Sequence, residues 1–303
     1  MKSIKYILAA FAMFTASTLF AQTIEDKGIT YKILSASDKT AAVIKCTDEI
    51  EGDVIIPANV GEGYVVTTIA DSAFLKCSGI TTITIGSNVK EVGRHIVDHC
   101  FAMTDFKVDD NNRNFSTWKG ILSNKDQSTL ICCPPGKVGT LTIPETILSL
   151  APAAFSTCKK LAEISISDNV KVIPEETFKG CWGLKQVHFP TQLEKIAYQA
   201  FANTILQKLF LPKSLRVIED EAFAHNSITE VNVFDPQNPP TLGKDVFGVE
   251  TKVMRLYVPN NAAIQVYRRA PRWNEFNVIM VQYDAAKYTK RFEAKEIGTE
   301  QGK

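Results

Sequence analysis

Three segments of the chain, IPEETFKGCWGLKQVHFP (residues 173–190), IAYQAFANTILQKLFLP (196–212) and IEDEAFAHNSITEVNV (218–233), repeat one pattern. In each, an aliphatic residue is followed five residues later by phenylalanine, and then by three apolar residues spaced as apolar-x-x-apolar-x-apolar. The pattern occurs four more times, once with Val97 in the phenylalanine position. The aliphatic anchors lie at positions 69, 92, 150, 173, 196, 218 and 242, so successive anchors are 22–24 residues apart except for one gap of 58. This near-constant period indicates a repeat protein.

The apolar spacing predicts one short strand in each repeat. Apolar residues at every second position bury one face of a strand, and a single coil cannot cover that face alone. Stacked coils bury it together, with neighbouring strands about 4.8 Å apart. We therefore predict a repeat solenoid, mainly β with short turns and helical segments, whose seven coils share a single hydrophobic interior. Its phenylalanines are predicted to form one buried row along the axis: Phe74, Phe155, Phe178, Phe201, Phe223 and Phe247.

This pattern resembles the BspA-type leucine-rich repeats of secreted and surface proteins from Bacteroidetes-like bacteria. The form aliphatic-x4-Phe-x2-Cys-x2-Leu-x2-Ile-x-Ile-Pro covers about residues 28–280. The second repeat departs from it by lacking the phenylalanine, and repeats five to seven lack the cysteine. The resemblance implies a leucine-rich repeat fold with a parallel strand ladder, and adhesion-type contacts with extracellular or host proteins.

The first 21 residues have the pattern of a secretory signal. Lys2 and Lys5 precede an uncharged apolar run over 7–20, and small residues lead to a predicted cleavage near Ala21. The run is shorter than the ~20 residues that span a membrane, and no later stretch is long and apolar enough to do so. The prediction is a secreted, cell-surface or periplasmic protein with no membrane span after signal removal.

The remaining sequence divides into a solenoid, two caps and a tail. Residues 22–60 alternate apolar and polar side chains and are predicted to be N-terminal capping strands, and 61–258 are predicted to be the solenoid. The 58-residue gap is predicted to hold a hairpin insertion at 109–141 that protrudes from the stack. Residues 259–282 are predicted to be a C-terminal cap, with a short helix over 262–269 and with Trp273 and Phe276 sealing the end. The tail at 283–303 is polar, and its composition is compatible with disorder.

The seven cysteines give no metal or redox signature, because no C-x-x-C is present. Cys77 and Cys100 are 23 residues apart, as are Cys158 and Cys181, so each pair occupies one position of successive coils. The distance between coils permits a disulfide, whereas parallel side chains aimed into one core favour a ladder of free buried thiols. The sequence leaves the disulfide question open, with free thiols as the favoured interpretation.

Composition and motifs argue against several classes of function. With 34 basic and 33 acidic residues, the chain has no general electrostatic affinity for nucleic acid or acidic membranes. No catalytic or phosphate-binding motif is present, so we predict no enzymatic activity and no cofactor. His95 and His99 have metal-ligand spacing, but a solvated turn is the favoured interpretation. The acidic run at 109–112 favours a turn over a calcium site.

The residues between the buried aliphatic positions are predicted to face outward and to form two columns across the strands. The central column is Thr84, Lys107, Ser165, His188, Phe210, Asn232 and Tyr257. The column before it is Thr82, Asp105, Glu163, Gln186, Lys208, Glu230 and Arg255. Exposed aromatic side chains on an extended surface are typical of recognition sites. The candidate binding residues are Lys107, His188, Phe210, Asn232, Tyr257, Arg255 and Lys208.

The sequence therefore favours a non-enzymatic secreted or cell-surface protein that uses its strand side to bind an extracellular or envelope protein or a glycan. The alternative is a structural scaffold of the periplasm or envelope, or a self-associating protein. The identity of the ligand and the oligomeric state are left open.

Overall fold

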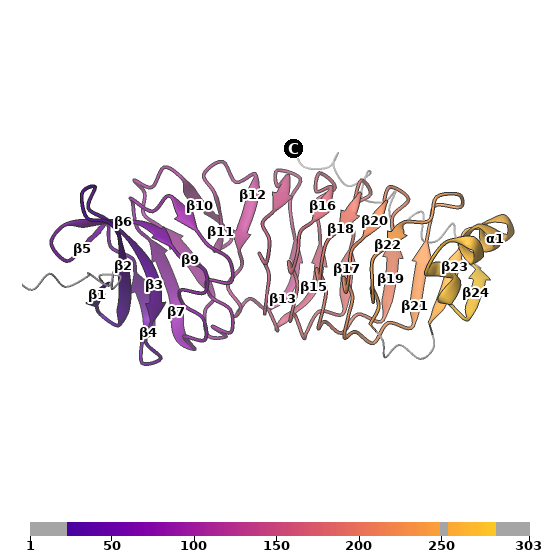
Figure 1. The fold of residues 1–303 in the computed structure, drawn as a ribbon, viewed down its shortest axis with the longest axis horizontal. Helices are drawn as coiled ribbons and strands as arrows, with labels where there is room; N and C mark the ends of the chain where they lie inside the picture. Colours follow the sequence, from indigo (N-terminus) through magenta and orange to yellow (C-terminus); the bar gives the residue numbers. More distant parts are fainter. Residues whose placement is uncertain (1–22, 249–253, 283–303) are drawn as a thin grey trace, which may run out of the picture.

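The computed structural model describes residues 23–248 and 254–282, which form an elongated solenoid of parallel strands with a few short helical segments (Figure 1). The predicted fold class is confirmed. The predicted signal segment 1–21 and the polar tail 283–303 lie outside the described residues. Within the described part of the chain, no helix has the length and apolar character needed to cross a membrane.

One long side of the solenoid, here called the strand face, is a ladder of parallel strands in three sheets, ordered β4-β7-β9, β13-β15-β17 and β19-β21-β23-β24. The strands are β4 (Glu51–Ile55), β7 (Gly79–Ile85), β9 (Asp105–Val108), β13 (Gly139–Thr142), β15 (Leu161–Ser165), β17 (Gln186–His188), β19 (Lys208–Leu211), β21 (Glu230–Val233), β23 (Arg255–Val258) and β24 (Val278–Val281). Seven of them are the strands predicted from the repeats. The other three, β4, β13 and β24, lie within the stretches predicted to be caps and insertion.

Six of the seven aliphatic anchors lie in two-residue strands, of which the last four form one parallel sheet, β16-β18-β20-β22 (Figure 1). These strands are β8 (Glu91–Val92), β14 (Ser149–Leu150), β16 (Val172–Ile173), β18 (Lys195–Ile196), β20 (Val217–Ile218) and β22 (Thr241–Leu242). Ile173, Ile196, Ile218 and Leu242 lie in parallel register. The sequence did not reveal this ladder, because two residues are too few to show an alternating pattern.

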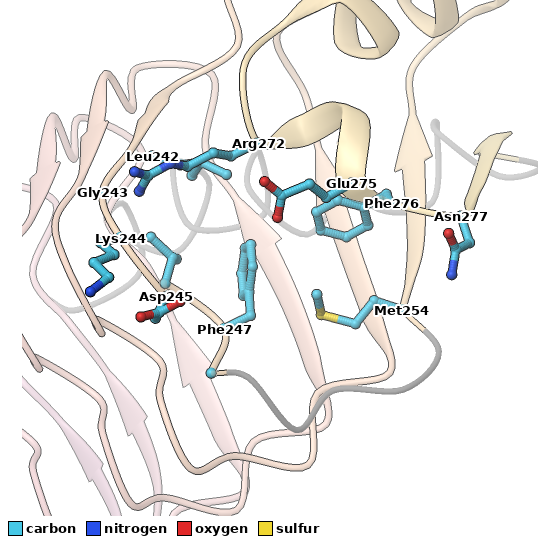
Figure 2. A pocket seen from close by; sticks show the side chains of 12 residues that line it. Leu242, Gly243, Lys244, Asp245, Phe247, Met254, Arg272, Glu275, Phe276 and Asn277 are labelled. Atoms are coloured by element: carbon cyan, nitrogen blue, oxygen red, sulfur yellow. The ribbon is translucent and has the colours of Figure 1, made fainter.

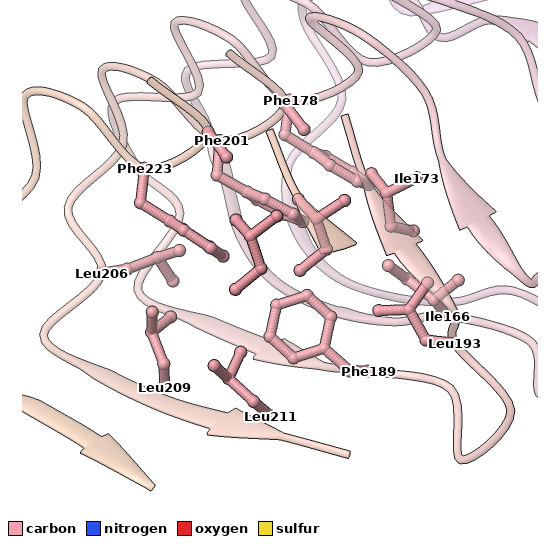
Figure 3. Close-up of a cluster of buried hydrophobic side chains, with 14 of the residues drawn as sticks. Ile166, Ile173, Phe178, Phe189, Leu193, Phe201, Leu206, Leu209, Leu211 and Phe223 are labelled. Atoms are coloured by element: carbon pink, nitrogen blue, oxygen red, sulfur yellow. The ribbon is translucent and has the colours of Figure 1, made fainter. Parts of the chain in front are cut away.

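Five of the predicted phenylalanines stack in one buried row, and Figure 3 shows three of them, Phe178, Phe201 and Phe223. Ring centroids are 5.1 Å apart for Phe155–Phe178, 5.0 Å for Phe178–Phe201, 5.3 Å for Phe201–Phe223 and 6.1 Å for Phe223–Phe247. The interplanar angles are 22° or less, so the rings are stacked. Phe74 is fully buried but belongs to a separate hydrophobic cluster.

The hairpin insertion is part of the stack, so the expectation that it protrudes is wrong. It consists of β10 (Phe115–Trp118), β11 (Ile121–Asn124) and β12 (Thr129–Cys132), and β12 pairs in parallel with β14. Ile121 packs into the C-terminal hydrophobic cluster and its neighbour Leu122 into the N-terminal one. Because the hairpin is apolar on both sides, it forms a wall between two cores. The expectation of a single hydrophobic interior is therefore also wrong.

The turns that carry the phenylalanine row have a recurrent backbone conformation. The residue two positions before each phenylalanine position has a positive φ, between 49° and 58°, in all seven repeats: Ser72, His95, Ala153, Glu176, Gln199, Glu221 and Asp245. Non-glycine residues adopt this conformation at some cost. Hydrogen bonds between coils offset that cost: the Phe178 N–H donates to Ala200 O at 2.8 Å, and the Phe201 N–H donates to Ala222 O at 2.8 Å.

The residue three positions after the phenylalanine position links successive coils by hydrogen bonds. Cys100 Sγ donates to Phe74 O at 2.9 Å, and Cys181 Sγ donates to Phe155 O at 3.0 Å. Where the sixth repeat lacks the cysteine, Asn226 Nδ2 donates to Phe201 O at 2.8 Å. In these three repeats a thiol or an amide at this position donates to the carbonyl of the phenylalanine position of the preceding coil.

The free thiols predicted at Cys100, Cys158 and Cys181 are observed, but the prediction is wrong for Cys77. Cys77 forms a disulfide with Cys46, whose Cα atom is 6.9 Å away. Cys46 ends the cap strand β3 (Thr40–Cys46) rather than lying in a neighbouring repeat, so the comparison of equivalent repeat positions did not consider it.

The two ends of the solenoid are closed differently. At the N-terminus, β1 (Thr23–Asp26), β2 (Ile29–Ser35) and β3 pair antiparallel, and β3 joins β6 (Tyr64–Ile69) in parallel. The short strand β5 (Asn59–Val60) also pairs with β6. This sheet covers the open edge of the first repeat, as terminal repeats of solenoids require.

At the C-terminus, α1 (Asn261–Arg269) and the 3-10 helix η1 (Trp273–Glu275) seal the core as predicted. Asn260 caps α1 by accepting a hydrogen bond from the Ala263 N–H at 3.0 Å. Trp273 is buried, and its Nε1 donates to Pro240 O at 2.7 Å. Its ring stacks on Phe276, which meets Phe247 at the end of the phenylalanine row edge to face.

Replacing a ring in the middle of the row is expected to destabilise the solenoid strongly. Phe201→Ala leaves a cavity between two stacked neighbours and is expected to lower the free energy of unfolding by about 3–5 kcal/mol. Urea denaturation followed by circular dichroism measures the loss. Tyr198→Ala, three residues away with an exposed side chain, is the matched control, with an expected change within ~0.5 kcal/mol. Equal losses in both variants would show that the row does not stabilise the fold.

Removal of the disulfide is expected to destabilise the N-terminal end. Its cysteines are 31 residues apart, and opening a loop of that size costs about 3–4 kcal/mol by the chain-entropy estimate. A Cys46→Ala, Cys77→Ala double variant should therefore unfold at lower denaturant concentration than the oxidised protein. Dithiothreitol should shift the wild type toward the variant and leave the variant unchanged. Wild-type unfolding that is insensitive to reductant contradicts this assignment.

Candidate binding face

The strand pairings place the predicted outward columns in register. In the central column Thr84 lies beside Lys107, Ser165 beside His188, and Asn232 between Phe210 and Tyr257. In the column before it, Lys208 lies beside Glu230, and Glu230 beside Arg255. All seven candidate binding residues thus lie on the strand face: Lys107, His188, Lys208, Phe210, Asn232, Arg255 and Tyr257.

The structure gathers five of these residues in one sheet and leaves two apart. Lys208, Phe210, Asn232, Arg255 and Tyr257 lie on β19, β21 and β23. Lys107 lies on β9, and the turn between β10 and β11 packs beside that strand: the Phe106 N–H donates to Gly120 O at 2.8 Å. The wall between the cores therefore also interrupts the outer surface. His188 lies in the middle sheet.

Asn232 does not present an open side chain as the outward pattern implied, since only 5% of its surface is exposed. Its Nδ2 donates to Leu209 O at 3.1 Å, and its Oδ1 accepts a hydrogen bond from Gln282 Nε2 at 3.3 Å. The side chain is held between two aromatic positions, Phe210 and Tyr257, that lie in register on either side. Asn232 is therefore placed to fix the spacing of these rings.

Met280 extends the aromatic column beyond the predicted residues. It lies in register with Tyr257 on β24 and is 46% exposed. The sequence analysis missed it because 259–282 was interpreted as a cap, whereas the repeat spacing continues weakly into β24. The set formed by Lys208, Phe210, Arg255, Tyr257 and Met280 is here called the C-terminal patch.

The remaining candidates on the strand face are held by polar partners. His188 Nε2 lies 2.7 Å from Glu163 Oε1 and 2.9 Å from Gln186 Nε2. Lys107 Nζ on β9 lies 3.7 Å from Asp53 Oδ2 on β4, across the intervening strand β7, and both side chains are well exposed. Thr81 donates a hydrogen bond to Asp53, and this bond more than the Lys107 charge lowers the pKa of the Asp53 carboxyl. These positions form a polar surface without a concentration of one charge.

His95 is not part of a solvated turn, so the favoured interpretation is wrong at this residue. Its Nδ1 lies 2.8 Å from Asp98 Oδ2, and its Nε2 lies 3.0 Å from Glu176 Oε2. The two carboxylates contact opposite ring nitrogens and do not converge on one point. In the described ranges, no group of three or more histidine, cysteine, aspartate or glutamate side chains is arranged to hold a metal ion.

These contacts belong to a junction cluster formed by Arg94, His95, Asp98, Glu175 and Glu176. It joins the second repeat to the fourth, 81 residues apart in the chain, and Arg94 pairs with Glu175. The hydrogen bond to Asp98 is the main cause that raises the pKa of His95. Burial alone would raise the pKa of Glu176, but its contacts with Lys179 and His95 lower it overall. The cluster thus favours charged His95 between charged carboxylates.

A pocket of about 470 Å³ lies at the C-terminal end, between the turn of the seventh repeat and η1 (Figure 2). Phe247, Met254 and Phe276 supply its apolar lining, and side chains of both charges lie around it: Lys244, Asp245, Arg272 and Glu275. Among the described residues that line this pocket, the polar side chains are Lys244, Asp245, Arg272, Glu275 and Asn277.

Residues 56–126 and 132–265 match the BspA type leucine rich repeat region, in 6 copies. The match covers more than half of the chain, and the protein belongs to this family. Proteins of this kind are in general binding scaffolds built from repeats. No curated protein matches the sequence.

Several solved structures are similar to this chain. The pneumococcal vaccine antigen PcpA is 14% identical, with a TM-score of 0.45 over 86% of this chain and 99% of that one. A leucine rich cell surface protein from Faecalibacterium prausnitzii is 14% identical, with a TM-score of 0.47 over 88% of this chain and 97% of that one. A leucine-rich repeat protein from Bacteroides ovatus is 19% identical, with a TM-score of 0.40 over 78% and 70% of the respective chains.

The junction cluster is expected to make stability depend on pH. A raised pKa of His95 contributes stability below its ordinary value of 6.5 that is lost as pH rises through the raised value. A lowered pKa of Glu176 contributes stability above its ordinary value of 4.5 that is lost as pH falls through the lowered value. Both contributions are present between these two pH values.

We therefore expect His95→Gln to reduce the free energy of unfolding most between about pH 4.5 and 6.5, and less at higher pH. Denaturant melts across pH 4 to 9 measure the difference from wild type. His225→Gln is the matched control, because His225 lies exposed at the turn of the sixth repeat. A His95 effect that does not change with pH would exclude the proposed charge interaction.

Proposed function

We propose that this protein is a non-enzymatic, secreted or cell-surface binding protein that contacts a protein partner through its strand face. The observation that carries the proposal is the C-terminal patch. There Phe210, Tyr257 and Met280 lie in one register column, with Lys208 and Arg255 exposed beside them.

The chemistry of this patch is suited to protein recognition. Aromatic residues, methionine and arginine are more frequent at protein–protein interfaces than on the rest of the protein surface. A half-buried ring held in position loses little conformational entropy on binding, and both rings of this column are half-buried on either side of the buried Asn232. The apolar column is flanked by long cationic side chains, which gives the arrangement of apolar centre and polar rim found in protein interfaces.

The size of the patch is also adequate. Four successive strands at about 4.8 Å cover roughly 15 Å along the axis. The other rungs of the strand face extend the surface toward the ~800 Å² that each partner contributes to a standard interface. These rungs also hold polar side chains of β15 and β17, which include Glu163 and His188.

The proposed localisation of the protein is based on its N-terminal sequence pattern. A signal-like segment at 1–21 and the absence of any later apolar stretch long enough to span a membrane support export. Adhesion to extracellular or host components is the role we propose within that setting, because BspA-type repeats occur in surface proteins.

A second candidate, self-association, is favoured by one feature of the ladder. Within the described ranges, β24 is the last strand of its sheet and pairs on one side only, with β23. Such an edge offers backbone groups to another strand. A scaffold in the periplasm or envelope would use this edge rather than the C-terminal patch.

The double variant Phe210→Asp, Tyr257→Ala tests the proposal. It introduces a charge at the centre of the patch and removes the second ring, so binding to extracellular-matrix or cell-surface extracts should weaken at least about tenfold. Surface plasmon resonance on immobilised extract proteins measures the change. Tyr198→Ala, Lys213→Gln is the control, with one exposed aromatic and one exposed cation removed elsewhere.

Unchanged binding of the patch variant, with its circular dichroism spectrum intact, would remove the strand face as the binding surface. Concentration-dependent dimers in size-exclusion chromatography that persist in the patch variant, with no binding to any extract, would support self-association through β24 instead.

A further inference from the structure

A second surface of unusual chemistry lies where the phenylalanine turns enter the strand face. Phe101, Lys159 and Trp182 occupy the same position, four residues after the phenylalanine position, in the second, third and fourth repeats. They are neighbours in space although 81 residues separate the first from the last, because the hairpin leaves the turns of these repeats in contact: the His99 N–H donates to Thr157 Oγ1 at 3.1 Å. This set, with His99, Lys160 and Lys185, is here called the aromatic edge.

Trp182 is the most exposed aromatic side chain of this edge, with 52% of its surface accessible. It follows the buried Cys181 and lies between Gly180 and Gly183, which have no side chains to cover the indole. Gly183 is required by packing, since a Cβ there would lie 2.3 Å from Lys159 O. The backbone of the fourth repeat is thus held tightly against the third, while the indole is directed to solvent.

Three rings form a continuous strip across the edge. The His99 ring lies 5.5 Å from Phe101 at an interplanar angle of 89°, and 6.5 Å from Trp182 at 48°. Contacts of this kind hold the rings in place without burying them fully. The core does not require them, because the apolar positions on either side, Cys181 and Leu184, are already fully buried.

The edge also concentrates positive charge. The four segments 76–81, 99–104, 157–162 and 180–185 contain four lysines and no aspartate or glutamate, although the whole chain is nearly neutral. Lys159 Nζ lies 3.5 Å from the centroid of the Phe101 ring. The preceding carboxylate, Asp98, is engaged by His95 and Ser156. In the described part of the chain Lys159, Lys160 and Lys185 form no ion pair with a carboxylate, whereas Lys208 pairs with Glu230.

An anionic polysaccharide fits this combination. The C–H faces of sugar rings pack on exposed indole and phenyl rings, and sulfate or carboxylate groups pair with lysines through charge-assisted hydrogen bonds. An acidic peptide would use the lysines but would not by itself need the exposed indole of Trp182. We propose that the aromatic edge binds an anionic polysaccharide, through Trp182 and Phe101 on its sugar rings and through Lys159, Lys160 and Lys185 on its acidic groups. This site is separate from the C-terminal patch.

Binding to two immobilised probes, heparin and polygalacturonate, tests the proposal on the purified protein. We expect retention on at least one probe and no retention on neutral dextran. Trp182→Ala and the double variant Lys159→Gln, Lys160→Gln should each weaken binding roughly tenfold. Tyr198→Ala and Lys213→Gln, which change an exposed tyrosine and an exposed lysine elsewhere, should bind like wild type. Trp182, Lys160, Tyr198 and Lys213 are exposed and Lys159 is half-buried, so thermal unfolding should change little in these variants.

Three outcomes would overturn the proposal. The first is no retention of the wild type on either probe. The second is full retention of Trp182→Ala together with equal binding to poly-L-glutamate, which would reduce the surface to a patch of charge that accepts any polyanion. The third is loss of probe binding in the strand-face variant Phe210→Asp, Tyr257→Ala, which would place the polysaccharide on the C-terminal patch. Failure of the protein-binding proposal leaves this measurement unaffected.

Discussion

The fold depends on two distances that agree with each other. Parallel strands lie about 4.8 Å apart, and stacked aromatic rings pack well at a similar separation. Between Phe155 and Phe223 the ring centroids are 5.0–5.3 Å apart, so one translation from coil to coil satisfies both the backbone hydrogen bonds and the ring contacts. A repeat of 22–24 residues is the length of chain that completes one coil and ends at the equivalent position, one such step further along the axis. Every surface position is set by the same step.

For this reason the periodic part of the structure could be predicted from the sequence. The buried row, the strands of the repeats and the outward columns all follow from the spacing of apolar residues. The register Phe210–Asn232–Tyr257 was accessible in this way, as was the sealing role of Trp273. Burial of Asn232 was not, because it depends on Gln282, which is outside the repeat pattern. Cys46 escaped notice for a related reason, since its partner lies in a cap strand rather than in an equivalent position of a neighbouring coil.

The non-periodic part gives the molecule its individual features. The hairpin replaces a coil and is apolar on both sides, so it divides the interior into two clusters. On the outside of the same boundary, the second and fourth repeats meet through Arg94 with Glu175 and His95 with Glu176. The aromatic edge spans the same repeats. Sequence reasoning had no means to place His99 beside Trp182, because the connecting chain of more than 80 residues contains the insertion.

The buried sulfur ladder has a consequence for how the protein matures. Burial raises the pKa of the Cys100 thiol to about 12, and it also raises the pKa of Cys132 and Cys181. At pKa 12, only about one thiol in 10⁵ is ionised at neutral pH, and the thiolate is the form that attacks disulfides. In the folded chain, burial therefore disfavours attack of the Cys100, Cys132 and Cys181 thiols on the Cys46–Cys77 disulfide.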